Sequence, residues 1–197
     1  NVVLNAATIS ATNVAAFTDT ATNLAAAFDG ITTSNSTLAI SGTTPATIAE
    51  LKTINAATNS DVVLNPQTIA TNYNDNAANL AAAFDGINTS TGDLTITGTD
   101  PATVAQLITI NEATSGAVIL NAQTIAANLN GTATELAAAF DGITTSTGNL
   151  TITGNTPATV AELTAINAAT NGAVVLNAQT IAAPLGGTAT ELAAAFD

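Results

Sequence analysis

Carboxylates are the main side chains that could do chemistry, because the 197-residue chain contains no cysteine and no histidine. A serine or cysteine nucleophile activated by histidine cannot be assembled from this composition. Two glutamates could share the acid–base steps of a glycosidase, and Glu50, Glu135, Glu162 and Glu191 are predicted to lie in helices. A glycosidase needs an asymmetric cleft, whereas these glutamates recur with the rest of the sequence. We interpret them as helix caps and solubilising groups, and expect neither catalytic residues nor an enzyme.

The aspartates recur as well, at Asp29, Asp85, Asp141 and Asp197. One carboxylate in each 56 residues is far from the clustered oxygen ligands that Ca²⁺ requires. The segment 72–76 is richer in oxygen ligands, but it occurs once and we interpret it as a loop. We therefore expect no metal site and no cofactor, with weak Ca²⁺ binding left open.

Threonine and asparagine provide the candidate binding surface. In the Leu-Thr-Ile-Thr segments the threonines should face away from the apolar residues, because side chains alternate along a strand. A regular threonine array could order water and bind ice, or it could be a solvated β surface, since threonine favours strands. The asparagines could form a polar row for a ligand, although we favour a role in satisfying backbone groups at turns. The candidate binding face consists of Thr95, Thr97, Asn121, Thr151, Thr153 and Asn177.

The charge excludes several classes of partner. The formal net charge is −13, with Lys52 as the single cation against 14 carboxylates. Nucleic-acid binding depends on cations that displace phosphate counterions, so we expect none, and no attraction to an anionic membrane surface. The sequence contains no run of about 18 apolar residues, so we predict no membrane span.

An internal repeat dominates the sequence. The string Leu-Ala-Ala-Ala-Phe-Asp begins at Leu24, Leu80, Leu136 and Leu192, always 56 residues apart. Residues 80–135 and 136–191 are identical at 44 of 56 aligned positions. We expect residues 1–197 to be a single array and a window of a longer chain. Its units are 24–79, 80–135 and 136–191, with partial units at both ends.

Each unit is predicted to contain two related strand–helix coils of about 28 residues each. Capping-box spacing at Thr132 and Thr188 predicts helix starts, as does a cap residue before proline at Pro45, Pro101 and Pro157. The continuously apolar run 118–120 indicates a strand covered on both faces. The fold class is thus an α/β tandem-repeat solenoid, with a parallel sheet and alanine-rich helices. Two separate sheets remain an alternative. The stack should curve or form a superhelix, because strands and helices have different spacings.

The segments Gly-Asn-Leu-Thr-Ile-Thr-Gly (148–154) and Thr-Pro-Ala-Thr-Val-Ala-Glu-Leu-Thr-Ala-Ile-Asn-Ala-Ala-Thr (156–170) resemble repeats of very large bacterial secreted or cell-surface proteins, including cyanobacterial ones. The resemblance covers essentially the whole chain. It implies an extracellular or cell-surface location and a spacer, adhesive or filament-forming role, but it transfers no functional residue.

We therefore expect a structural repeat segment that forms a stalk, surface layer or filament. The terminal segments 2–4 and 192–196 show no polar cap, so we also expect end-to-end self-association. The alternative is a binding module, either an adhesin or an ice-binding surface, that uses the Thr/Asn-rich face. The surface or glycan partner of such a module is not specified by the sequence.

Overall fold

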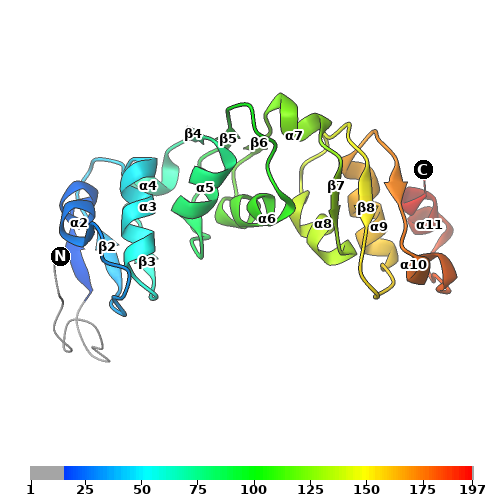
Figure 1. Ribbon diagram of the computed structural model, residues 1–197, viewed down its shortest axis with the longest axis horizontal. Coiled ribbons are helices and arrows are strands. Elements are labelled where there is room, and N and C mark those ends of the chain that lie inside the picture. The colour runs from blue at the N-terminus through cyan, green and yellow to red at the C-terminus, as the bar shows by residue number, and fades with distance from the viewer. Residues whose placement is uncertain (1–15, 197) are drawn as a thin grey trace.

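The computed structural model describes residues 16–196 and shows an α/β protein of short parallel strands alternating with helices. The elements follow one another along the long axis in chain order, from α2 at one end to α11 at the other (Figure 1). The terminal segment 2–4, for which the sequence shows no polar cap, and Asp197 lie outside the described residues.

The elements form three blocks with the same internal order. Block 1 consists of β1 (Phe17–Asp19), α2 (Ala21–Phe28), β2 (Leu38–Ile40), α3 (Ile48–Ala57), β3 (Val62–Val63) and α4 (Pro66–Ala70). Block 2 consists of β4 (Tyr73–Asp75), α5 (Ala77–Phe84), β5 (Leu94–Ile96), α6 (Val104–Ala113), β6 (Val118–Ile119) and α7 (Ala122–Ala126). Block 3 consists of β7 (Leu129–Gly131), α8 (Ala133–Ala139), β8 (Leu150–Ile152), α9 (Val160–Ala169), β9 (Val174–Val175) and α10 (Ala178–Ala182). Helix α11 (Ala189–Ala195) follows block 3.

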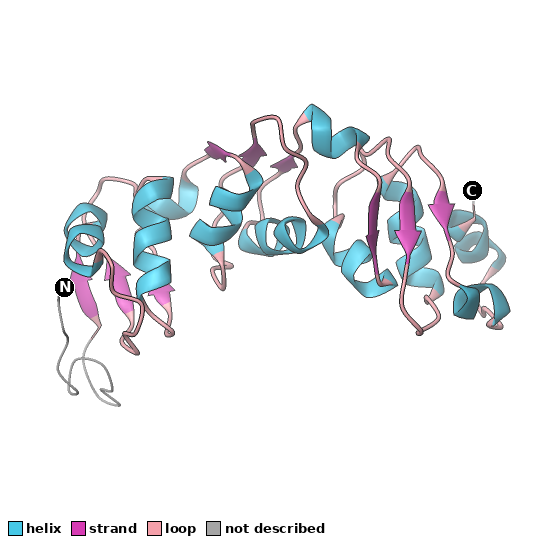
Figure 2. Cartoon of the chain, viewed as in Figure 1, coloured by secondary structure: helices cyan, strands magenta, loops and turns pink. Residues whose placement is uncertain are grey.

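The strands of each block form their own three-stranded parallel sheet, in the orders β1-β2-β3, β4-β5-β6 and β7-β8-β9 (Figure 2). The prediction of one continuous sheet with two strand–helix coils in each unit is therefore wrong. The two-sheet alternative is also wrong, because all the strands of a block share one sheet. Three strands at a spacing of about 4.8 Å span roughly 10 Å, whereas neighbouring helices need about 8–10 Å each. This difference in spacing is a physical reason for the breaks between sheets, and a short helix such as α4 lies in the connection to the next sheet.

The strand that the sequence did not reveal is the first of each block. Residues 73–75 were predicted to be a loop, but they form β4 and pair with β5. The Tyr73 ring is buried against Phe84, with ring centroids 5.6 Å apart, and its hydroxyl donates to the carbonyl of Ala46 at 2.8 Å. Burial raises the pKa of Tyr73, which keeps this donor protonated. Two of the three residues of β4, Asn74 and Asp75, are polar, so the sequence pattern indicated a loop.

The helix starts are partly as predicted. The capping boxes at Thr132 and Thr188 are confirmed, since each threonine hydroxyl accepts from the third helical N–H. The three prolines of the prediction, Pro45, Pro101 and Pro157, are not the first residues of helices. Pro45 and its counterparts lie in the preceding loop, and the helices begin after Thr47, Thr103 and Thr159. A threonine with Glu or Gln three residues later satisfies two N–H groups at once, which fixes the start there.

The core lies between one row of long helices and the inner faces of the sheets. The contacts run without interruption along α2, α3, α5, α6, α8, α9 and α11. Ala83, Ala113 and Ala139 are fully buried, and their small side chains let these helices approach closely. Leu94 is fully buried while the next residue, Thr95, is half-buried, which confirms the predicted alternation.

Only one face of each sheet is covered. Ile119, in the run that we expected to be covered on both faces, is 47% exposed because helices pack on a single side of its strand. No helix in the described part of the chain is long and apolar enough to cross a membrane.

Candidate functional site

The uncovered faces of the sheets carry the predicted threonines. Thr95 lies in the middle strand of its sheet, between Asn74 on β4 and Ile119 on β6. The equivalent row on the third sheet is Asn130, Thr151 and Val175. Each row thus places one half-buried threonine beside a half-exposed aliphatic side chain. Such a row offers a small mixed surface rather than a dense array of hydroxyl groups.

Thr97 and Thr153 follow directly after the middle strands, and both are exposed. Their backbone N–H groups donate to the carbonyls of Asp75 and Gly131, each at 2.8 Å, which continues the ladder by one residue. The structure therefore brings Thr95 and Thr97 together on one sheet and Thr151 and Thr153 on another. It does not join the four threonines into one flat surface.

Asn121 and Asn177 have a different role from the threonines. The side-chain oxygen of Asn121 accepts from the Thr124 N–H at 2.9 Å, which makes Asn121 the N-cap of α7. Its amide nitrogen donates to the carbonyls of Gly98 and Asp100, at 3.1 and 3.0 Å. Asn177 repeats this arrangement at the start of α10. Both amides are thus engaged with the backbone of their own block, in the manner expected of a structural turn.

A second set of asparagines connects successive blocks. Asn55, near the end of α3, donates to the carbonyls of Ala82 and Asp85 at 3.3 and 2.9 Å, beyond the end of block 1. Asn111 makes the same pair of bonds to Ala138 and Asp141, each at 3.0 Å. A helix C-terminus leaves carbonyl groups without intrahelical donors, and these side chains supply them from the preceding block. We had predicted that these asparagines satisfy backbone groups, but not that they do so between blocks.

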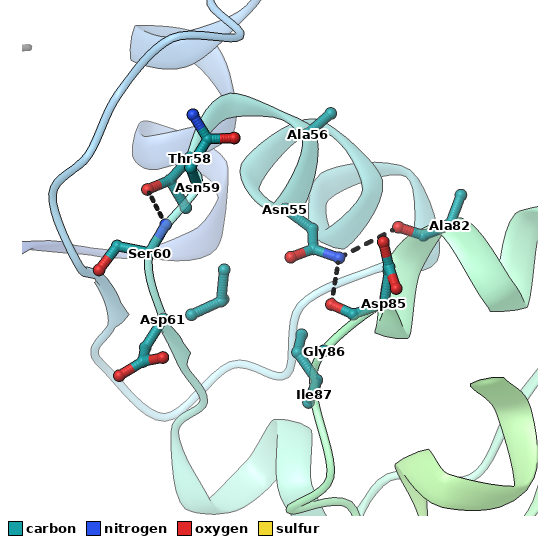
Figure 3. A pocket seen from close by; sticks show the side chains of 11 residues that line it. Asn55, Ala56, Thr58, Asn59, Ser60, Asp61, Ala82, Asp85, Gly86 and Ile87 are labelled. Carbon is teal, nitrogen blue, oxygen red and sulfur yellow. Dashed lines mark hydrogen bonds between the residues drawn. The ribbon is translucent and has the colours of Figure 1, made fainter.

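The side chain of Asn55 lines a hollow between blocks 1 and 2, with a volume of about 550 Å³ (Figure 3). Asp61 and Asp85 lie on different sides of it (Figure 3). The hollow is open to solvent, and it is lined mostly by alanine and polar residues, with Val62 and Ile87 as larger apolar members. No group of three or more acidic side chains that could hold a metal ion occurs among residues 16–196.

The glutamates are engaged in capping the helices. The Glu135 carboxylate accepts from the Thr132 N–H at 2.8 Å and from its hydroxyl at 2.9 Å, and these bonds lower the pKa of Glu135. Burial raises the pKa of Glu162, but bonds from Thr159 and the Thr134 hydroxyl outweigh it and lower the pKa overall. A lowered pKa keeps the carboxylate ionised at neutral pH and unsuited to act as a general acid.

Two recurrent features were missed from the sequence. Thr124 is fully buried, and its hydroxyl accepts from the N–H of Ala102 at 2.8 Å. Gly92 and Gly148 lie where the backbone of the preceding block, at Thr71 and Ala127, passes too close to leave room for a side chain. A Cβ at Gly148 would lie 1.8 Å from the carbonyl oxygen of Ala127. The signal was present, since both features recur at the 56-residue spacing, but glycine and threonine are too common to stand out alone.

The comparisons with known proteins add no family to this description. No family model, no curated protein and no solved structure matches the chain.

Proposed function

We propose that this chain is a structural repeat segment of an extracellular bacterial protein. In this proposal the blocks are repeats of an α/β solenoid, curved along its length, that forms a stalk, surface layer or filament by stacking. The strands β1, β4 and β7 begin 56 residues apart, at Phe17, Tyr73 and Leu129, which supports a structural period equal to the sequence period. The resemblance of residues 148–170 to repeats of large surface proteins supports the location.

The links between blocks carry the proposal. Blocks 1 and 2 each present an asparagine on their second long helix, Asn55 or Asn111, to the helix end of the following block. The carbonyl of Ile69 accepts from the N–H groups of Thr91 and Gly92, at 2.8 and 3.2 Å, and ties the end of block 1 to block 2. These recurrent asparagines thus bind backbone groups of the neighbouring block and are not gathered around a ligand. Such contacts would stiffen a spacer.

The acidic charge is consistent with this role. A net charge of −13 keeps such molecules soluble and repels other copies laterally, so assembly is favoured only where specific contacts form. Association would occur end to end along the long axis. Neither nucleic acid nor membrane insertion is part of the proposal.

Electron microscopy of the purified protein over a concentration series tests the proposal, with and without Ca²⁺. Fibres one molecule wide are the expected result. Discrete particles at every concentration, together with a monomer mass by light scattering, would argue against filament formation through the ends. A difference between the two Ca²⁺ conditions would identify the ion as a bridge between carboxylates.

A second candidate is a binding module that uses the uncovered sheet faces. The observation in its favour is the half-exposed Ile119 and Val175 beside Thr95 and Thr151. Ice binding would appear as thermal hysteresis, and an adhesin as a signal on a glycan array. Replacing both threonines with lysine should abolish either signal. The matched control is Thr99→Lys, in an exposed turn outside the rows.

A further inference from the structure

The single cation of the chain, Lys52, lies at the joint between blocks 1 and 2. It belongs to α3 and is half-buried, and its Nζ atom donates to the side-chain oxygen of Asn79 on α5 at 2.5 Å. Helices α3 and α5 are neighbours in the helix row, so their packing holds the two side chains together. A lysine amine and an asparagine amide are therefore in contact across the joint.

The amide of Asn79 is also held at its nitrogen. Its Nδ2 atom donates to a carboxylate oxygen of Asp75 at 2.8 Å. The same carboxylate oxygen accepts from the backbone N–H of Asn76 at 2.7 Å, which fixes the carboxylate at the start of α5. The amide thus lies between an amine at its oxygen and a carboxylate at its nitrogen.

An amine, an amide and a carboxylate are the three groups that a transamidation requires. The amine is the nucleophile, the amide carbon is the electrophile, and the carboxylate moves protons between the two nitrogen atoms. Well-oriented groups within one molecule react as if they were present at about 10⁵–10⁸ M. A reaction that is negligible between separate molecules thereby becomes feasible within the folded chain.

This arrangement does not follow the repeat. At the joint between blocks 2 and 3 the equivalent positions hold Ile108 and Glu135. In block 1 the Asn23 amide donates to Asp19 at 2.8 Å, which repeats the amide–carboxylate pair, but the sequence has no second lysine to accompany it. Residues that cap helices or satisfy backbone groups recur with the fold, whereas this group of three occurs once.

We propose that Lys52 and Asn79 form an isopeptide bond that ties block 1 covalently to block 2. The lysine ammonium first gives a proton to solvent. Rotation of the terminal bonds of the lysine then moves Nζ from the amide oxygen to the adjacent carbon, and its lone pair adds to Cγ of Asn79. In this adduct Nζ and Nδ2 are bonded to the same carbon, so Asp75, which holds Nδ2, also reaches Nζ.

The carboxylate of Asp75 completes the reaction. It accepts a proton from Nζ and passes it to Nδ2, the bond between Cγ and Nδ2 breaks, and ammonia leaves. Ammonia takes up the proton that the lysine gave to solvent. The products are one secondary amide and one ammonium ion, and the step consumes no oxidant or cofactor.

The bond changes the mechanics of one joint. It closes a loop of the chain from residue 52 to residue 79, which contains β3, α4 and β4. Such a crosslink restricts the unfolded chain as a disulfide does, in a protein that has no cysteine to form one. The joint between blocks 2 and 3 has no such bond and depends on packing and hydrogen bonds. The reaction occurs within one chain, so the inference does not depend on end-to-end assembly.

Trypsin tests the bond directly, because Lys52 is the only residue of the chain after which it cleaves. The isopeptide removes the charge that trypsin recognises, so the denatured wild-type chain should stay intact. Its mass should be lower by one ammonia molecule. A protease that cleaves after acidic residues should release residues 51–61 joined to residues 76–85, which tandem mass spectrometry identifies.

Three variants control the experiment. Lys52→Arg keeps the charge and the trypsin site but carries no free amine, so the denatured chain should be cut completely. Asp75→Asn still accepts both hydrogen bonds but cannot transfer the proton, and should slow crosslinking by about 10²–10⁴-fold. Asp19→Asn is the matched control, because it changes the equivalent carboxylate of block 1, and it should leave the crosslink unchanged.

Three outcomes would contradict the proposal. Complete cleavage of the denatured wild-type chain, with an unchanged mass, would overturn it and leave a hydrogen bond between Lys52 and Asn79. Loss of ammonia from the Lys52→Arg variant would also overturn it, because the loss would then not arise from the crosslink. Equal crosslinking of the wild type and Asp75→Asn would overturn the role of Asp75. None of these outcomes bears on the end-to-end assembly, which electron microscopy tests separately.

Discussion

The row of long helices and the layer of strands are built along the same axis, but only the helices are continuous. Each helix from α2 to α11 in this row contacts the next, whereas the strands stop after three and restart in a new sheet. Strand pairing therefore stabilises a block internally. Helix packing, the asparagines at helix ends and the glycine turns hold one block to the next. The joints between blocks therefore depend on a few identifiable side chains.

The largest effect is expected from the core of the helix row. Phe84→Ala removes a fully buried ring and should lower the stability by about 3–5 kcal/mol. Phe196 has the same local sequence but is 56% exposed, so Phe196→Ala is the matched control and should change little. Urea unfolding followed by circular dichroism measures both. Equal losses would show that the two helix ends are buried alike in solution.

The next effect concerns the glycine turns at the joints. Gly148→Ala puts a methyl group against backbone that cannot move aside, and should cost about 1–3 kcal/mol. Gly186→Ala meets no atom within 4 Å and should be nearly neutral. Limited proteolysis should find a new cleavage between blocks 2 and 3 in the first variant only. Cleavage within a sheet instead would contradict the expectation that the contacts between blocks open before a block unfolds.

A smaller effect is expected from the asparagine link. Asn111→Ala leaves the carbonyls of Ala138 and Asp141 without their side-chain donor, at a cost of about 0.5–1.5 kcal/mol. Hydrogen exchange of the amides near the end of α8 should increase. Asn155→Ala, in an exposed turn, serves as the control. Unchanged exchange at α8 would mean that water replaces the asparagine without loss.

The smallest effect is a change in pH dependence. Although burial raises it, the pKa of Glu162 is lowered overall in the folded protein by the hydrogen bonds to its carboxylate. Its stabilising effect is therefore present above the pKa of the unfolded chain and is lost as the pH falls through the lowered value. Glu162→Gln should therefore flatten part of the fall in Tm between neutral and acid pH. Block 2 already has Gln106 at this position. Glu112→Gln, on the exposed side of α6, is the control.

The sequence predicted the helix row well and the strands poorly. Thr132 with Glu135 is a local signal that depends on four consecutive residues, so the start of α8 could be identified without the fold. Strand β4 has three residues, two of them polar, and exists because β5 pairs with it. Pairing between distant residues leaves little trace in such a short segment, which is why Tyr73 was placed in a loop.

The candidate binding face was predicted in part. The outward direction of Thr95 followed from strand alternation, but its separation from Thr151 on another sheet depended on where the sheets break. The sequence predicts that Asn121 satisfies backbone groups at a turn, but not that it caps α7. The links made by Asn55 and Asn111 could not be predicted, because they join residues whose proximity arises only when blocks stack.

The direction of the asparagine links bears on synthesis of the chain. Asn55 precedes the carbonyls that it serves, by 27 and 30 residues, and Asn111 does the same. A ribosome therefore releases each donor before the helix end that it serves. Because domains generally fold from the amino-terminal end during synthesis, this order allows each block to dock onto the block before it.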